Sequence, residues 1–238
     1  MKNIKYKIQL PLAAIVASAL TVIGTANATV SVFTASADTY INPANANANF
    51  GGGDELVIND NNGRTAFISF DISSFTGTLT EANLSLAFVN GDTSNSYGVF
   101  GINEAFDNFS ETGLTSNTAV SSGLTAFDTT FGTNLVTPAA TFGSTTFSTS
   151  GPLPGGSIVT AFDVTSGSIF DFINADTDGI ITFAIAEPGS DSGAGIFASR
   201  ENGSFAPPTL TLTTAVPEPS SSLLLGLGAV GFLLRRRR

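Results

Sequence analysis

Short stretches in which apolar and polar residues alternate recur along most of the chain. Within residues 64–71, Ala66, Ile68 and Phe70 fall on one side, and the polar residues Thr65 and Ser69 fall on the other. This period of two is typical of a β-strand with one buried face. Similar stretches lie at residues 30–33, 37–41, 55–58, 84–88, 97–102, 157–164, 181–185, 196–199 and 209–213. About ten to twelve short strands predict an all-β fold, in which two sheets pack as a β-sandwich.

Only one segment has the pattern of a helix. Residues 167–173 place their apolar side chains on one helical face, and Thr165 or Ser166 is expected to cap the helix N-terminus. The stretch 110–156 is rich in Ser, Thr and Gly, but phenylalanines interrupt it at intervals. That content is too apolar for a disordered linker, so short strands joined by loops are predicted there.

The N-terminus has the features of an export signal. Lysines in the first seven residues precede an apolar run at residues 10–23, and Ala26 and Ala28 then form a small-x-small cleavage pattern. This order predicts a signal peptide of residues 1–28, with a signal helix that is removed by cleavage after Ala28.

The C-terminus has three successive parts. They are the motif Val216-Pro217-Glu218-Pro219, an apolar run at residues 223–234, and arginines at 235–238. The prolines end the preceding structure. As a helix, the apolar run would be about 18 Å long at ~1.5 Å per residue, which is short of the ~20 residues that cross a bilayer. The arginines are expected to stay on the cytoplasmic side.

This three-part order resembles the PEP-CTERM sorting signal of Gram-negative bacteria. The resemblance implies that an exosortase, a membrane protease-transferase, recognises and processes the tail after transient anchoring in the inner membrane. The alternative is an ordinary stop-transfer anchor. The predicted domains are therefore a signal peptide (1–28), a β-sandwich domain (29–215) and a sorting signal with a hydrophobic helix (216–238).

The charge of the chain is very unevenly distributed. The two terminal segments hold all basic residues except Arg64 and Arg200, whereas the segment between them carries eighteen of the nineteen acidic residues. Two positive against eighteen negative charges leave this segment with a net charge of −16. Such a surface repels nucleic acid and attracts divalent cations, so we expect no nucleic-acid partner and membrane contact only through the terminal segments.

The residue types that are missing exclude several kinds of chemistry. The chain has no Cys and no His, and no Lys remains after the signal peptide. Disulfides, ordinary zinc sites, Ser-His-Asp triads and Schiff-base lysines are therefore excluded. Carboxylates, Tyr40, Tyr97 and the two arginines remain as candidate chemical groups.

A second resemblance spans most of the segment between the two signals. The stretches that carry it are Asp38-Thr39-Tyr40, Gly63–Ser73 (GRTAFISFDIS), the Leu-x-Leu strand at 84–86, Asp163-Val164-Thr165, Phe197–Glu201 and Pro208-Thr209-Leu210. They resemble the DNRLRE-type domain, which implies a jelly-roll β-sandwich akin to carbohydrate-binding modules. Some members of the DNRLRE-type family bind alginate. The chain departs from that pattern at Phe109 and Phe172, where the family has Trp, and in having only Arg64 on a strand that is usually richer in Arg.

One loop has the spacing of a cation site. Asn174, Asp176 and Asp178, followed by Gly179, copy the first half of a calcium-binding loop. An EF-hand needs Glu at the twelfth position, where Ile185 stands, so an EF-hand is excluded. Two interpretations remain: a turn between the helix and the next strand, or a calcium site that distant carboxylates complete. The same two interpretations apply to residues 60–63.

The two arginines are expected to serve the fold. In so acidic a segment, carboxylates should surround both Arg64 and Arg200, and an ion pair between Asp38 and Arg200 is predicted as a buried clamp between the first and last strands. Tyr40 and Tyr97 lie in alternating strands, where packing is a more common role than sugar stacking.

Together these features predict an exported, exosortase-processed, non-catalytic protein of the cell envelope, cell surface or extracellular matrix. Its expected role is adhesion or contact with an extracellular polysaccharide. The alternative is a polysaccharide lyase or glycosidase that uses Tyr and carboxylates, because paired carboxylates cleave glycosides without His. No cofactor is expected other than calcium, which an acidic polysaccharide would need in order to bind to so acidic a domain.

Overall fold

The computed structural model describes residues 28–59, 63–91, 95–102, 104, 107–121, 145–148, 153–187 and 193–215. The predicted signal helix, Ala26, the motif Val216–Pro219 and the predicted hydrophobic helix lie outside these ranges. Thr29–Ala215 forms one compact unit. Within the described ranges, no helix has the length and the apolar composition needed to cross a bilayer.

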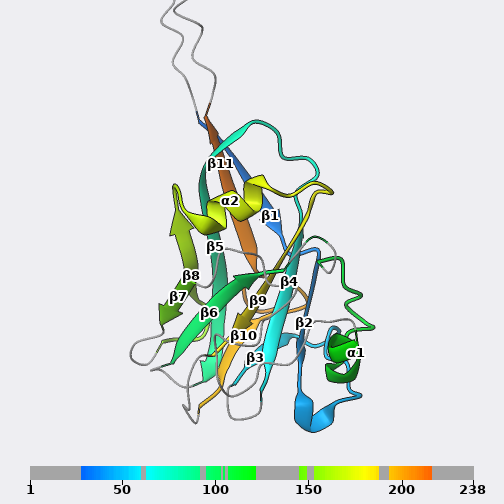
Figure 1. Cartoon of the computed structure of the whole chain (residues 1–238). Helices are drawn as coiled ribbons and strands as arrows, with labels where there is room; N and C mark the ends of the chain where they lie inside the picture. The colour runs from blue at the N-terminus through cyan, green and yellow to red at the C-terminus, as the bar shows by residue number, and fades with distance from the viewer. Residues whose placement is uncertain are drawn as a thin grey trace, which may run out of the picture. The chain divides into compact units, whose positions relative to one another are not determined.

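Two β-sheets make up this unit (Figure 1). The six-stranded sheet contains β1 (Thr29–Thr34), β11 (Thr209–Ala215), β5 (Thr78–Gly91), β10 (Gly195–Ala198), β3 (Glu55–Ile58) and β8 (Ser157–Val164). The five-stranded sheet has the order β2 (Ala37–Ile41), β4 (Thr65–Asp71), β9 (Ile180–Ala186), β6 (Ser96–Gly101) and β7 (Thr145–Ser148). All pairings between these strands are antiparallel. The predicted two-sheet β-sandwich is confirmed.

The main core lies between the two sheets. Alternate residues of β4, such as Ile68 and Phe70, pack there with Phe183 of β9 and with Leu84 and Phe197 of the six-stranded sheet. The rings of Phe70 and Phe183 meet edge to face with centroids 6.3 Å apart. In a domain without disulfides, the burial of these aromatic and aliphatic side chains is the dominant stabilising term.

The other face of the five-stranded sheet is also covered. Phe67 and Ala184 point to that face and pack with Leu114 and Ala119, which come from the segment 107–121. The polar residues of β4 are therefore buried rather than hydrated, and Ser69 is only 3% exposed. The sequence pattern assigned the two faces of β4 correctly, but it contained no sign that a distant segment covers the second one.

The short helices correct the sequence-based expectations. The helix α2 spans Ser168–Asn174, and its N-cap is Gly167 (φ 101), with no side-chain cap. The expected cap by Thr165 or Ser166 is therefore wrong. A second helix, α1 (Ser116–Ser121), lies where strands were predicted. It begins with a capping pair in which Thr118 donates its backbone N–H to Thr115 Oγ1 (3.1 Å) and Thr115 donates its own to Thr118 Oγ1 (2.7 Å).

Candidate functional site

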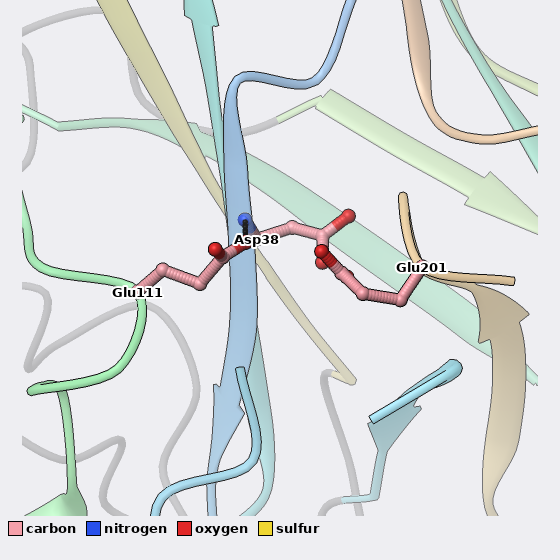
Figure 2. A group of neighbouring side chains, drawn as sticks. All are labelled: Asp38, Glu111 and Glu201. Atoms are coloured by element: carbon pink, nitrogen blue, oxygen red, sulfur yellow. Dashed lines mark hydrogen bonds between the residues drawn. The ribbon is translucent and has the colours of Figure 1, made fainter. Parts of the chain in front are cut away.

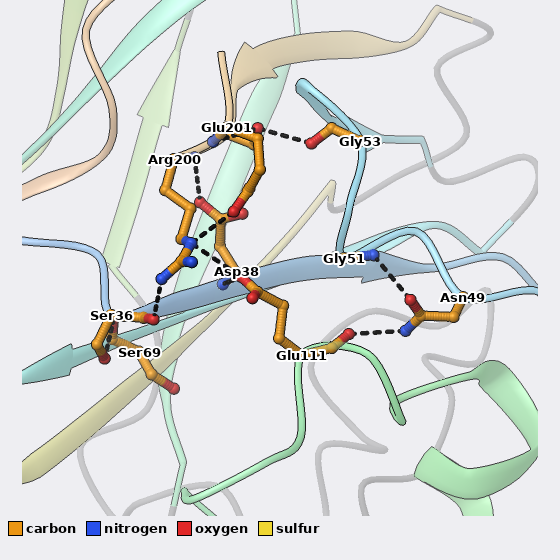
Figure 3. Close-up of polar contacts among 10 residues, drawn as sticks. Ser36, Asp38, Asn49, Gly51, Gly53, Ser69, Glu111, Arg200 and Glu201 are labelled. Atoms are coloured by element: carbon orange, nitrogen blue, oxygen red, sulfur yellow. Dashed lines mark hydrogen bonds and ion pairs between the residues drawn. The ribbon is translucent and has the colours of Figure 1, made fainter. Parts of the chain in front are cut away.

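Arg200 lies among three carboxylates that come from distant parts of the chain, and this group is called the arginine cluster below (Figure 3). Its Nε atom is 2.5 Å from Glu201 Oε1 and 3.2 Å from Glu111 Oε1. Its Nη1 donates to the backbone carbonyl of Ser36. The backbone N–H of Arg200 donates to Asp38 Oδ2 at 2.8 Å. Residues of β2, of the segment 107–121 that covers the outer face of the five-stranded sheet (called the covering segment below) and of the loop after β10 thus meet at the Arg200 guanidinium.

The predicted Asp38–Arg200 ion pair needs correction. The two residues do meet, but the contact uses the backbone of Arg200, whereas the guanidinium pairs with Glu111 and Glu201. The Arg200 side chain is 38% exposed, so it is not a buried clamp. The position of Glu111 depends on a loop after β6 that the sequence pattern did not link to β2.

Asp38 is the most deeply buried carboxylate of the arginine cluster, with 1% of its surface exposed. Figure 2 shows it between Glu111 and Glu201. Burial raises the pKa of Asp38 from 3.8 to about 7; the hydrogen bond from the Arg200 backbone opposes this rise, and the charges of Glu201 and Glu111 add to it. Asp38 Oδ1 is buried without a hydrogen-bond partner.

A second group of carboxylates, called the acidic cluster below, lies near the loop between α2 and β9. Oxygen atoms of Glu104, Asp176 and Asp178 all lie within 4.8 Å of one another. Burial and, to a smaller extent, the charges of Asp178, Glu104 and Asp176 together raise the pKa of Asp107 to about 7, so Asp107 lies near these three residues. Burial also raises the pKa of Asp176 to about 6, against the hydrogen bond from Gly179.

The acidic cluster contains two of the three predicted calcium ligands. Asp176 and Asp178 lie together, and Glu104 is a distant carboxylate that lies beside them. Asn174 is the exposed last residue of α2, and its role as a ligand stays a prediction. Sequence reasoning missed Glu104 and Asp107, because no local pattern marks a carboxylate that lies about 70 residues from its neighbours in space.

A groove beside β2 and β3 carries the one tyrosine that is accessible among the described residues. The Tyr40 ring stacks on Phe50 with centroids 4.3 Å apart and an interplanar angle of 19°. The groove has a volume of about 480 Å³. Its lining consists of Tyr40, Asn49, Phe50, Gly52, Gly53, Asp54, Glu55, Val57 and Thr112. Tyr97, in contrast, is fully buried, as the packing interpretation expected.

The loop that supplies Phe50 is attached firmly to the covering segment. Asn49 donates through Nδ2 to the carbonyls of Glu111 (2.7 Å) and Leu114 (2.8 Å), and its Oδ1 accepts the N–H of Gly51 at 3.2 Å. A Cβ on Gly51 would lie 2.2 Å from the Glu111 carbonyl oxygen, so this approach requires glycine. The asparagine-rich stretch at residues 42–49 is therefore held at its end by specific hydrogen bonds.

Phe109, Phe172 and Arg64, which are all among the described residues, do not provide a comparable site. Phe109 and Phe172, which replace the family tryptophans, pack edge to face on Phe67 and Phe183. Among the described residues, no carboxylate lies within ion-pair distance of Arg64, so carboxylates surround only Arg200 as expected. The turn at residues 60–63 falls mostly outside the described ranges.

Comparisons with known families agree with this geometry. Residues 29–136 match carbohydrate-binding module family 96, and residues 215–238 match the PEP-CTERM protein-sorting motif. The carbohydrate-binding-module-like domain and the sorting signal that the sequence predicted are thereby confirmed. The sorting motif indicates export and membrane-associated sorting. A search of curated proteins found no match.

The module match includes every residue that lines the groove, together with Asp38, Glu104, Asp107 and Glu111. Arg200, Asp176 and Asp178 lie beyond its end. Both carboxylate clusters therefore join residues within the matched segment to residues outside it, whereas the groove lies wholly within it.

Proposed function

We propose that this protein is an exported, non-catalytic component of the cell surface or extracellular matrix that binds a polysaccharide in the Tyr40–Phe50 groove. An exosortase-type enzyme processes its tail. The observation that supports the binding site is the stacked aromatic pair in a groove whose lining also offers polar side chains and glycine backbone. The match to the sorting motif supports export, and the match to the carbohydrate-binding module supports contact with a carbohydrate.

The groove combines the two kinds of contact that a sugar ring needs. Aromatic rings pack against the apolar C–H faces of a sugar, and polar groups bond to its hydroxyls. Tyr40 and Phe50 supply the first kind, whereas Asn49 and Thr112 supply the second. The volume of about 480 Å³ falls within the ~300–1,000 Å³ that is usual for small-ligand sites, so the groove holds a short section of a glycan.

The negative charge of the groove favours neutral polysaccharides over acidic ones. Asp54 and Glu55 line it, and the whole sandwich carries a large negative charge. A polyuronate such as alginate would meet repulsion within the ~8 Å over which charges act at physiological salt. The proposed ligand is therefore a neutral polysaccharide, and an acidic one binds only when divalent cations bridge carboxylates on both sides.

A catalytic role receives no support from the groove. A lyase that uses tyrosine as a base needs a lowered pKa at that residue. Burial raises the pKa of Tyr40 above its ordinary value of 10.0; the charge of Arg64 opposes this shift, and that of Glu55 adds to it. Tyr40 is therefore suited to packing against a ligand rather than to removing a proton from it.

Binding of the purified exported protein to neutral and acidic polysaccharides, measured by affinity electrophoresis, tests the proposal. Tyr40→Ala and Phe50→Ala should each weaken binding about five- to 150-fold, because loss of one aromatic contact costs ~1–3 kcal/mol. Tyr40→Phe keeps the stacked pair and should bind nearly as well as the unchanged protein.

Val32→Ala is the matched control, because Val32 is an exposed apolar residue on β1 that does not line the groove. It should leave binding unchanged. Equal binding by the Tyr40→Ala variant and the unchanged protein, with melting temperatures that show both to be folded, would place the glycan elsewhere. Absence of binding to every polysaccharide tested would count against carbohydrate contact itself.

A further inference from the structure

The acidic cluster has the dimensions of a site for a single hard cation. Ca²⁺ takes six to eight oxygen ligands at ~2.3–2.6 Å, so ligands on opposite sides of the ion are roughly 5 Å apart. Oxygens of Glu104, Asp176 and Asp178 lie within 4.8 Å of one another, and each of them can therefore reach the same ion.

Hydrogen bonds hold these carboxylates through one oxygen each. Asp176 accepts the Gly179 N–H through Oδ2 at 3.0 Å, and Asp178 accepts the Ile180 N–H through Oδ1 at 2.8 Å. Glu104 accepts the backbone N–H of Thr177 through Oε1 at 3.2 Å, and the Thr177 hydroxyl donates to the same atom. Asp176 Oδ1 is buried without a hydrogen-bond partner. In each carboxylate, hydrogen bonds to one oxygen fix the orientation of the side chain. The second oxygen of Asp176 remains available to coordinate a cation.

Asp107 is a separate observation that points to a ligand. Only 2% of this residue is exposed, and its Oδ1 has no hydrogen-bond partner. Its backbone carbonyl accepts the hydroxyls of Ser69 and Thr182, which fixes the residue against β4 and β9 at the side of the acidic cluster. A buried carboxylate oxygen without a partner is costly, and a coordinated cation removes that cost.

No fixed positive charge compensates the acidic cluster within the described parts of the chain. The segment between the two signals contains only Arg64 and Arg200 as basic residues, and Arg200 pairs with Glu111 and Glu201 of the arginine cluster. Three carboxylates whose oxygens lie within 4.8 Å of one another, with the buried Asp107 nearby, need a counter-charge if they are to be ionised together. A cation from solution can supply that counter-charge.

We propose that the acidic cluster binds one calcium ion, with Glu104, Asp107, Asp176 and Asp178 as its ligands. The all-oxygen donor set excludes soft metals, and an ion of flexible geometry suits it better than Mg²⁺, which demands octahedral coordination and keeps its waters. The ion joins the segment after β6 to the loop between α2 and β9. This site is independent of glycan binding, because it lies near Asp71 at one end of β4, whereas Tyr40 pairs with Ala66 at the other end.

Thermal unfolding and calorimetric titration of the purified exported protein with CaCl₂, after treatment with chelator, test the site. Calcium should raise the melting temperature by about 5–10 °C at a hundredfold excess over its Kd, with one ion bound per chain. The same concentration of MgCl₂ should have a clearly smaller effect. Asp107→Asn and Asp176→Asn should each abolish the calcium-dependent rise.

These two variants keep the size of the side chain and remove a negative charge, so in chelator they should melt no lower than the unchanged protein. Asp163→Asn, which removes an exposed carboxylate on β8, is the control and should respond to calcium fully. Absence of calorimetric heat and of any melting shift would refute the site. A full calcium response in both Asp107→Asn and Asp176→Asn would refute this ligand set.

Discussion

The arginine cluster and the acidic cluster both bring carboxylates close together, but they differ in whether a cation of the chain offsets the repulsion between these carboxylates. Each gathers carboxylates from distant segments, and each has a carboxylate with a pKa of about 7. In the arginine cluster the fold supplies the cation as Arg200, and the Asp38 carboxylate also accepts a backbone N–H. In the acidic cluster the described residues supply none. The contrast is that the arginine cluster contains its own cation, whereas the described residues of the acidic cluster contain none.

The clusters also differ in the backbone that carries them. Asp38 lies within β2, where strand pairing holds it, whereas Asp176 and Asp178 lie in a loop that turns at Gly179. Gly179 has φ +85, and a Cβ there would lie 2.9 Å from Ser73 Cα. The acidic cluster therefore relies on a turn that only glycine can form without strain.

The largest expected effect comes from breaking that turn. Gly179→Ala should lower the free energy of unfolding by about 2–5 kcal/mol, because it adds left-handed backbone strain and a clash with the Ser73 backbone. Gly167→Ala is the matched control, since Gly167 has φ +101 but no atom within 4 Å of its added Cβ. It should cost only the strain, about 1–2 kcal/mol. Urea denaturation measures both, and equal losses would show that the contact with Ser73 does not limit the turn.

The buried acid of the arginine cluster predicts a pH dependence. The raised pKa of Asp38 means that the native state keeps a proton which the unfolded chain releases near pH 4. Stability should therefore fall as pH rises from about 4 to about 7, by roughly 2–4 kcal/mol, and Asp38→Asn should remove that part of the slope. Urea denaturation in chelator, at intervals between pH 4 and pH 8, gives both slopes.

Asp71→Asn is the control for this pH dependence. Hydrogen bonds from the Ser73 side chain and backbone lower the pKa of Asp71, so its contribution to stability is lost only as the pH falls below about 4. The variant should leave the slope between pH 5 and pH 8 unchanged. An Asp38→Asn variant with the full slope of the unchanged protein would mean that Asp38 is ionised at little cost in the native state.

The smallest expected effect on stability comes from removing the Arg200 side chain. Because the Arg200 side chain is 38% exposed and its backbone N–H to Asp38 survives the substitution, Arg200→Ala should cost only about 1 kcal/mol. The substitution also converts the arginine cluster into a second group of carboxylates without a cation. Calcium titration should then detect two ions per chain instead of one, because oxygens of Asp38, Glu111 and Glu201 already lie within 4.8 Å of one another.

Arg200→Lys keeps the positive charge, so it should retain a stoichiometry of one. An Arg200→Ala protein that loses stability but still binds a single ion would show that the presence of Arg200 is not what separates the two clusters.

Local residue patterns were sufficient to predict several features of this protein. Alternation within segments such as 64–71 and 181–185 predicted strands, and two sheets of such strands were confirmed. The order Pro-Glu-Pro, apolar run and arginines predicted the sorting motif, which the family comparison confirmed. The spacing of Asp176 and Asp178 indicated that their carboxylates would lie close together, and oxygens of both lie within 4.8 Å of each other. Each of these signals lies within about two dozen neighbouring residues, so it can be recognised without knowing which distant residues meet.

The tertiary structure decided which distant residues meet. Asp38 contacts Glu111 and Arg200 across 73 and 162 positions, and Glu104 reaches Thr177 across 73. These contacts depend on sheet order, on register and on the segment 107–121, which folds over the outer face of the five-stranded sheet. A shift of one residue in β2 would turn Asp38 to the opposite face of the sheet. The sequence by itself determined that carboxylates would greatly outnumber cations, and only packing decided which carboxylates received one of the two arginines.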